Sequence, residues 1–147
     1  MLKGHFVNSI NEKGRLSIPS KFRDILKEWG APYLVVTKSI DHCLLAFAPD
    51  DWSRMEKKAS TLSMVKREDI VFKRHFVGSA EDCPIDAQGR ILIPAGLREY
   101  AGLRKKCLLV GIVDRFEIWD QDTYNKSMEE AFEDSEKLRQ GLAELGL

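Results

Sequence analysis

The sequence lacks the features of a membrane-spanning, secreted or disulfide-bonded protein. No apolar run approaches the roughly 20 residues of a membrane span, and the first eight residues contain no apolar signal core. The only cysteines, Cys43, Cys83 and Cys107, are odd in number and widely spaced, and no histidine pair lies near them to complete a zinc site. Because their neighbours are apolar, we predict small buried thiols. The missing membrane span and signal core predict a cytoplasmic protein.

Motifs of catalytic and nucleotide-binding sites are also missing. There is no Gly-x-Ser-x-Gly elbow, Gly-x-Gly-x-x-Gly turn or phosphate-binding loop. The histidines, His5, His42 and His75, are scattered, and no two have the spacing of metal ligands. Acidic residues gather on residues 129–134, which is the pattern of a solvated helix and not of a catalytic carboxylate pair. We therefore expect no enzymatic activity, no bound metal and no cofactor.

The chain as a whole has no excess of positive or negative charge, but some of its segments do. Lys and Arg balance Asp and Glu at 23 each, so the net charge is +0. Residues 1–30 carry a net charge of +3, residues 54–75 carry +4, and residues 120–147 carry −5. A chain divided in this way can have a basic surface that binds a polyanion. Two ordinary solvated helices of opposite sign would give the same count.

The sequence does contain the same unit twice. Residues 10–19 (INEKGRLSIP) return as residues 85–94 (IDAQGRILIP), and Phe22-Arg23 returns as Leu97-Arg98 at the same offset of 75. The 147 residues, of which 44% are hydrophobic, suffice for one compact domain or two small ones. The duplication predicts a pseudo-twofold architecture with two copies of one surface.

Each repeat has the pattern strand, hairpin, strand, short helix, strand, turn, strand. We predict strands over residues 4–9, 15–18, 33–37, 44–47, 77–83, 90–93, 107–111 and 116–119, and short helices over residues 20–29 and 95–101. Four short strands cannot cover their own apolar face, whereas two copies can close into a barrel without exposed edges. The expected fold is therefore mainly β with α (α+β): one intertwined barrel from two tandem repeats.

Helical sequence lies between and after the repeats. We predict helices over residues 50–63, capped by Asp50 or Asp51, and over residues 66–76. A last helix, over residues 123–145, has an apolar stripe that must be buried on its own barrel or on a neighbouring subunit. The three apolar stripes are Trp52, Met55, Ala59 and Leu62; Ile70, Val71 and Phe76; and Met128, Ala131, Phe132, Leu138, Leu142 and Leu145. The expected units are a first repeat over 1–53, a helical insert over 54–76, a second repeat over 77–125 and an acidic amphipathic helix over 126–147.

The candidate functional residues lie in the two hairpin turns. A glycine next to an arginine lets the backbone approach a ligand, and a guanidinium has a planar fork of donors suited to phosphate or to a guanine edge. Lys13 adds a point charge beside Arg15, and Asp86 is placed to orient Arg90. The first turn has Asn11 in place of that acid, so we expect Arg15 to be freer than Arg90. The alternative is that each pair only locks its hairpin.

A second pair of arginines, Arg23 and Arg98, lies on the short helices that follow the prolines. These arginines are placed to line the same face as the turn arginines. The alternative is that each is an exposed helix arginine paired with a nearby acid such as Asp24 or Glu99.

Two signatures resemble a known type of DNA-binding domain. Residues 14–23 (GRLSIPSKFR) and 89–98 (GRILIPAGLR) are similar to the Gly-Arg-apolar-x-Ile-Pro-x-x-apolar-Arg signature of AbrB/SpoVT-type domains. Two such copies, separated by a helical insert in a chain of this length, resemble the MraZ family. The resemblance covers essentially the whole chain.

The resemblance implies a swapped-hairpin β-barrel in which the two repeats together mimic an AbrB-type dimer. It implies a cytoplasmic, nucleoid-associated transcription regulator, usually a repressor, that binds repeated short DNA boxes upstream of the division and cell-wall gene cluster. It also implies a ring-like homo-oligomer that binds double-stranded DNA and neither a membrane nor a small-molecule substrate. The alternative function is a non-enzymatic scaffold that binds protein partners.

The resemblance also assigns roles to individual positions. The Asp-x-x-x-Arg motif of the family maps onto residues 86–90, and onto residues 11–15 in the first repeat, where the acid is missing. The resemblance nominates Arg15, Arg23, Arg90 and Arg98 as DNA-binding residues. The charge of Lys13 beside Arg15 adds Lys13 to this set. The implied motif-supporting residues are Asn11, Gly14, Asp86 and Gly89.

Overall fold

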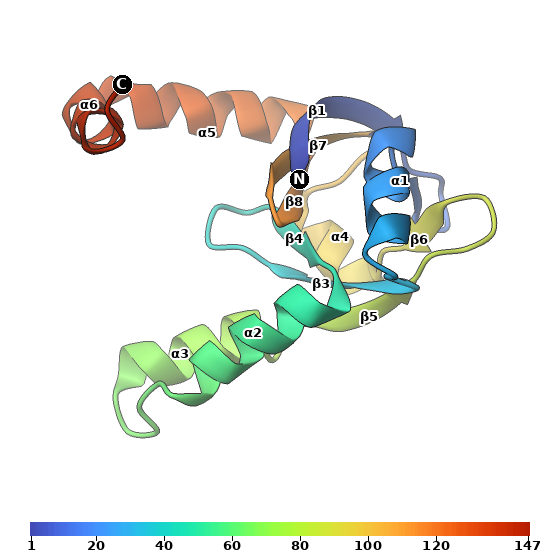
Figure 1. Cartoon of the computed structure of the whole chain (residues 1–147), viewed down its shortest axis with the longest axis horizontal. Helices are drawn as coiled ribbons and strands as arrows, with labels where there is room; N and C mark the ends of the chain where they lie inside the picture. Colours follow the sequence, from blue (N-terminus) through green and yellow to red (C-terminus); the bar gives the residue numbers. More distant parts are fainter.

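The two repeats exchange strands within one six-stranded antiparallel sheet (Figure 1). In the computed structural model, which describes all residues 1–147, the strands run in the order β1 (Leu2–Ser9), β7 (Lys106–Val113), β8 (Arg115–Asp120), β4 (Leu44–Phe47), β3 (Tyr33–Lys38) and β5 (Glu81–Pro84). Strand β1 of the first repeat pairs with β7 of the second, and β5 of the second pairs with β3 of the first. The intertwined α+β architecture expected from the duplication is therefore confirmed.

A second, two-stranded sheet joins the hairpins of the two repeats. Its strands are β2 (Arg15–Ser17) and β6 (Arg90–Leu92), and Leu16 lies opposite Ile91 with both side chains buried, at 0% and 1% exposure. The expectation of a closed barrel is wrong, because β1 and β5 remain edges of the larger sheet. A single bridge, between Ile10 and Leu16, links β1 to β2. Strands β2 and β6 have only three residues each, which leaves little length for pairing with the larger sheet. The backbone hydrogen bonding between the two sheets is therefore interrupted.

A short helix follows each hairpin and covers the core. The helices α1 (Ser20–Glu28) and α4 (Ala95–Ala101) begin directly after Pro19 and Pro94. Proline suits a helix start because its fixed φ is already helical and it has no N–H to leave unsatisfied. Gly102 ends α4 in the left-handed conformation, with φ +61°.

Phe22 of α1 lies at the centre of the core. Its side chain is 1% exposed, and its ring centroid is 5.0 Å from that of Phe6 and 5.2 Å from that of Phe116. Leu16 and Ile91 belong to the same cluster of 20 buried residues. The two-stranded sheet is therefore fixed to the body of the protein by the same apolar packing that holds α1.

A helical arm of two helices separates the repeats. It consists of α2 (Pro49–Ser60) and α3 (Arg67–Phe76), close to the predicted ranges. The predicted capping of α2 by Asp50 or Asp51 is wrong, since the cap position is Ala48 and no side chain caps it. The helix begins at Pro49 instead. Proline has no backbone N–H, so no acceptor is needed at that position.

The apolar side of α3 differs from the predicted one. Phe72 and Phe76 stack with ring centroids 5.3 Å apart, and Phe76 also packs on Trp52 at 5.2 Å, whereas Val71 is 44% exposed. Aromatic rings bury more area than a valine, so their contacts set the rotation of the helix. The chain then turns over residues 77–80, and β5 begins four residues later than predicted.

The C-terminal segment forms two helices and not the single one predicted. Helix α5 (Gln121–Glu133) is capped by Asp120, whose carboxylate accepts a hydrogen bond from the Thr123 backbone N–H at 3.2 Å, and α6 (Ser135–Glu144) follows. The helix breaks at Asp134, where the backbone leaves the helical conformation, with φ −106° and ψ 78°. The residues of the apolar stripe remain exposed, and the stripe is not buried on the chain's own body: Met128, Phe132, Leu138, Leu142 and Leu145.

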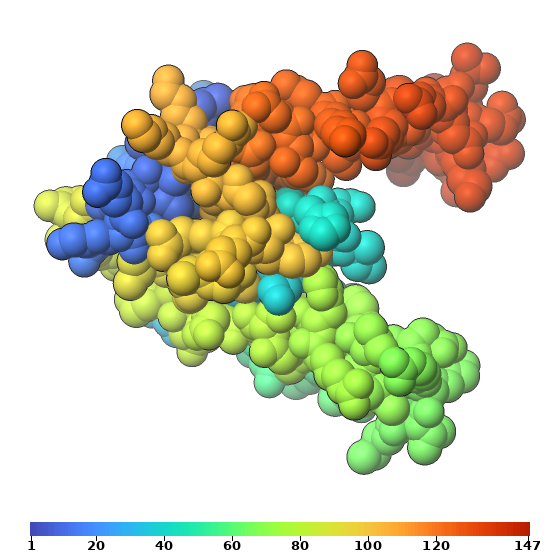
Figure 2. All heavy atoms as spheres, turned by 180° about the vertical axis from the view of Figure 1, so that it is seen from behind, coloured from blue at the N-terminus to red at the C-terminus, as the bar shows by residue number.

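Both arms leave the β-body on the side opposite to the hairpin turns. In Figure 1 the turns from β1 to β2 and from β5 to β6 are on the right, while α2–α3 and α5–α6 extend to the left. Figure 2 shows the same separation from behind, with the C-terminal arm in red and the α2–α3 arm in green. Neither arm covers the hairpin turns. No helix in the structure is both long and apolar enough to cross a membrane.

The three cysteines are buried and free, as predicted. Burial raises the pKa of Cys83 and of Cys107 to about 12, and it also raises the pKa of Cys43. The thiols are therefore protonated, small side chains of the core.

Replacing Phe22 with Ala is expected to lower the free energy of unfolding by about 3–5 kcal/mol, because it removes a buried ring and leaves a cavity. Urea denaturation followed by circular dichroism measures this change. Val71→Ala, at a side chain that is 44% exposed, is the control and should change stability by less than about 0.5 kcal/mol. Equal effects of the two substitutions would contradict the assigned core.

Candidate nucleic-acid interface

The two hairpin turns have the same hydrogen bonds although their first residues differ. Asn11 Oδ1 accepts from the backbone N–H groups of Lys13 at 3.1 Å and Arg15 at 2.9 Å. In the second turn, Asp86 Oδ1 accepts from the corresponding N–H groups, both at 2.9 Å. Asn and Asp both provide the oxygen that such a turn requires. The replacement of the acid by Asn11 therefore leaves the turn intact and removes only a charge.

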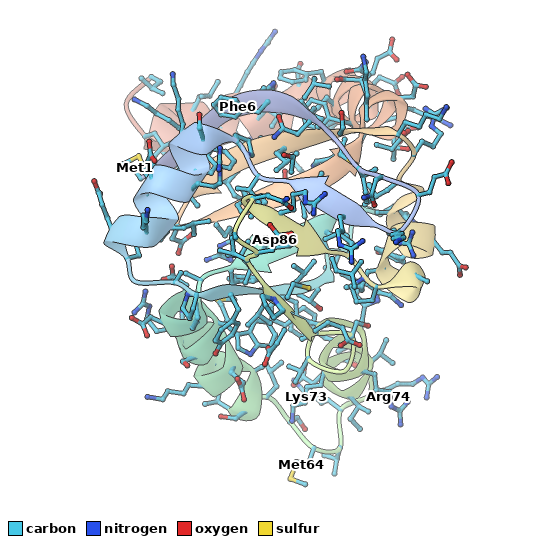
Figure 3. The ribbon with its side chains drawn as sticks, turned by 90° about the vertical axis from the view of Figure 1, so that its right-hand side faces the viewer. Met1, Phe6, Met64, Lys73, Arg74 and Asp86 are labelled. Carbon is cyan, nitrogen blue, oxygen red and sulfur yellow. The ribbon has the colours of Figure 1, made fainter.

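The β2–β6 pair forms a ribbon with an arginine near each end of its outer face. Arg15 lies opposite Leu92, and Arg90 lies opposite Ser17. Side chains alternate across a strand, so these four residues share the face opposite to buried Leu16 and Ile91. Figure 3 looks onto the hairpin side of the molecule, with Asp86 near the centre of the view. Neither arginine is sealed in the core: Arg15 is half-buried, and the side chain of Arg90 is 34% exposed.

The two ribbon arginines differ in how they are held. Arg90 Nε donates to Asp86 Oδ2 at 3.2 Å, and Arg90 Nη2 donates to Gln88 Oε1. The backbone N–H groups of Arg90 and Gln88, and then the side chain of Arg90, lower the pKa of Asp86. The guanidinium of Arg15 forms no ion pair or hydrogen bond with the rest of the chain, and the neighbouring Lys13 is exposed. The prediction that Arg15 is the freer of the two agrees with this geometry.

Each helix arginine packs against the hairpin glycine of the other repeat. A Cβ atom added at Gly14 would lie 2.8 Å from Cζ and Nε of Arg98, and one added at Gly89 would collide with the side chain of Arg23. Arg98 Nη1 also contacts the Glu12 carbonyl oxygen at 3.5 Å, and its buried Nε has no partner. Arg23 and Arg98 form no ion pair with neighbouring acids. They are therefore not the ion-paired helix arginines of the alternative interpretation. The repeat gives the positions of the glycines and arginines in the sequence. It does not predict that each helix arginine packs on the hairpin glycine of the other repeat.

The sequence reasoning missed two lysines at the edge of this surface. Lys105 and Lys106 are exposed, and the backbone N–H of Ile10 donates to the Lys105 carbonyl at 2.9 Å. With Arg98 and the first hairpin turn they line a cleft of about 640 Å³. The basic run of residues 104–106 is a sequence signal for them, but only the pairing of β1 with β7 shows that they lie beside the hairpin.

Replacing Gly14 with Ala should destabilise the protein more than replacing Gly30 with Ala. Both glycines have positive φ, +93° and +66°, so each substitution carries the left-handed strain of roughly 1–2 kcal/mol. At Gly14 the added methyl also meets Arg98 and the Ile93 carbonyl oxygen, whereas nothing lies within 4 Å at Gly30. We expect an additional loss of at least about 1 kcal/mol at Gly14. Thermal and urea unfolding of both variants measure the difference, and equal losses would argue against the packing of Arg98 on the turn.

Asp86→Asn should show a pH-dependent loss of stability. The amide keeps both backbone hydrogen bonds, as Asn11 does in the first turn, but it loses the charge that pairs with Arg90. The folded pKa of Asp86 lies below its unfolded value near 4, so its charge stabilises the fold above that value and the contribution is lost as the pH falls through the folded pKa. The stability gap between wild type and variant should be constant above about pH 5 and shrink as the pH falls below the unfolded pKa near 4. A gap in urea denaturation that persists at low pH would contradict this.

Comparison with known proteins gives one consistent family. A family model described as "MraZ protein, putative antitoxin-like" matches the chain twice, over residues 1–75 and 76–144. A transcriptional regulator MraZ from Syntrophobacter fumaroxidans is 40% identical over 145 residues, which are 99% of this chain and 96% of the relative. Those from Caldicellulosiruptor saccharolyticus and Limosilactobacillus reuteri are 37% and 41% identical, over 100% and 97% of both chains. With its duplicated signature and exchanged hairpins, the chain belongs to the MraZ family.

Proposed function

We propose that the chain is a sequence-specific DNA-binding transcriptional regulator that contacts double-stranded DNA with its hairpin face. The single observation that carries this proposal is the outward, unpaired Arg15 on a two-stranded ribbon, with Lys13 exposed beside it. A two-stranded ribbon fits the major groove of B-DNA, where the arginines of a protein contact phosphate oxygens and base edges. The relatives' names describe a transcriptional regulator, which supports a regulatory and not an enzymatic function.

The neutral net charge is compatible with DNA binding because the charges are separated in space. The acidic C-terminal arm extends from the side of the body opposite to the hairpin turns (Figure 1). At physiological salt the Debye length is about 8 Å, so distant acidic groups are largely screened from a phosphate at the hairpin face. The local charge that the DNA meets is therefore that of the hairpin residues and not the average over the chain.

We also propose that the chain acts as a homo-oligomer on repeated DNA boxes. One hairpin face offers few ionic contacts, so it should bind weakly and lose affinity steeply with salt. Joining several faces raises the effective concentration of each face at neighbouring boxes. The exposed apolar stripe of α5–α6 favours self-association, because copies of the chain could bury it. The family resemblance supports boxes upstream of the division and cell-wall gene cluster, repression as the outcome and association with the nucleoid.

A non-enzymatic scaffold is the second candidate function, because the same apolar stripe could bind another protein. Footprinting of the full chain on the DNA that precedes its own gene, with unrelated DNA as competitor, separates the two. Protection of regularly spaced boxes supports the regulator. Absence of any protection, even at low salt, would contradict it and leave the scaffold.

Arg15→Ala should weaken binding to every box by about 10- to 100-fold, which corresponds to the roughly 1.5–3 kcal/mol of a hydrogen bond to a charged group. Fluorescence anisotropy with a labelled duplex measures affinity, and size-exclusion chromatography checks that assembly is unchanged. The matched control is Lys57→Ala, which removes one positive charge from an exposed position on α2. If Arg15→Ala bound as tightly as wild type while Lys57→Ala did not, the proposed face would be wrong.

A further inference from the structure

We propose that the two ends of the ribbon contact DNA in different ways. The first-hairpin end is a clamp for the phosphate backbone, completed by Lys105 and Lys106, and the second-hairpin end reads base edges through Arg90. This inference rests on the proposed DNA-binding function and adds a division of roles to it.

The clamp is formed where β1 and β7 meet the first turn. Lys106 pairs with Ser9 in the sheet, and the Lys105 carbonyl accepts the backbone hydrogen bond of Ile10, so both lysines are held next to the turn. Arg104, which precedes them, is neutralised by Asp120 at 3.0 Å and Asp122 at 2.7 Å. The two lysines form no such pair. Their charges therefore remain available to a polyanion.

The other positively charged residues at the first-hairpin end also indicate a polyanionic ligand. Lys13 is exposed, and Arg98 lines the same cleft as Lys105 and Lys106. Glu12 is the one acidic residue among the residues lining that cleft. A lysine ammonium is a compact charge on a flexible stem and has no preferred direction of approach. Such groups suit phosphate oxygens, which position a protein on DNA without reporting sequence.

The corresponding place at the second hairpin has no such lysines. By the pseudo-twofold symmetry, Tyr33 pairs with Pro84 as Lys106 pairs with Ser9. The Pro32 carbonyl accepts a hydrogen bond from the backbone N–H of Ile85, just as the Lys105 carbonyl accepts one from Ile10. Pro32 and Tyr33 therefore occupy the positions that correspond to Lys105 and Lys106 at the first-hairpin end. The cleft at this end, about 520 Å³ in volume, is lined by two acidic residues, Asp24 and Asp86, beside the basic residues Arg23 and Lys27.

Arg90 is oriented by two acceptors before any ligand binds. Asp86 holds Nε, and Gln88 accepts one hydrogen of Nη2. A guanidinium has five N–H donors, so both Nη1 hydrogens and one Nη2 hydrogen remain, along the edge that can contact guanine O6 and N7 together. A side chain already fixed in direction loses less rotamer entropy on binding, and misdirected contacts to other bases are disfavoured. Arg15, with no such acceptors, is suited to a phosphate.

Two variants of the full chain separate the roles. The Lys105→Ala, Lys106→Ala double variant should weaken binding to the target duplex and to an unrelated duplex by the same factor, and should reduce the slope of log affinity against log salt by about 2. Gln88→Ala keeps the turn, because only the backbone of Gln88 bonds to Asp86. It should lower the preference for the target duplex by roughly 2- to 10-fold and leave the salt slope unchanged.

The measurement is fluorescence anisotropy over a series of salt concentrations, with the duplex recovered by footprinting and an unrelated duplex of equal length. Lys57→Ala, Lys58→Ala on α2 is the control with equal charge loss and should change neither quantity. The inference is overturned if the double lysine variant lowers the target preference at an unchanged salt slope, or if Gln88→Ala weakens both duplexes equally. A wild-type chain with no preference between the duplexes would overturn the proposed function as well, whereas a preference that neither variant alters would overturn this inference alone.

Discussion

The pairing of Leu16 with Ile91 decides where the cations of the hairpin face can lie. Both side chains are buried at the centre of the β2–β6 ribbon, and side chains alternate along a strand, so the adjacent Arg15 and Arg90 must face outward. A register shift of one residue would bury both guanidinium groups and expose two large apolar side chains. The ribbon forms only because strands are exchanged between the repeats. The duplicated fold and its outward arginines are therefore consequences of the same burial.

The hairpin glycines tie this face to the helices behind it. Arg98 packs on Gly14 and Arg23 packs on Gly89, so each turn is supported by the repeat to which it does not belong. The supports are symmetric but the charges around them are not, because Asp86 pairs with Arg90 and no acid pairs with its counterpart Arg15. A symmetric scaffold thus carries an asymmetric electrostatic surface. Both arms, one of them acidic, extend from the opposite side of the body.

Repetition and periodicity predict the elements of this fold, but not how its layers meet. The tight turns, the two proline-started helices and the intertwined α+β architecture follow from the duplicated signature. The closed barrel does not form, because strands of three residues leave little length for pairing between the sheets. The last helix breaks at Asp134, whose backbone is not helical. Among the site residues, the freedom of Arg15 could be predicted from the missing acid. The place of Lys105 and the packing of Arg98 depend on contacts between repeats, for which one sequence has no signal.

The central claim is that DNA meets the hairpin face and not the helical arms. Lysine acetylation of the full chain, with and without its target duplex, followed by mass spectrometry, tests it most directly. The account predicts that Lys13, Lys105 and Lys106 lose reactivity when DNA is bound, whereas Lys57 and Lys58 on α2 react as before. Protection of the α2 lysines with unchanged reactivity of the other three would contradict it.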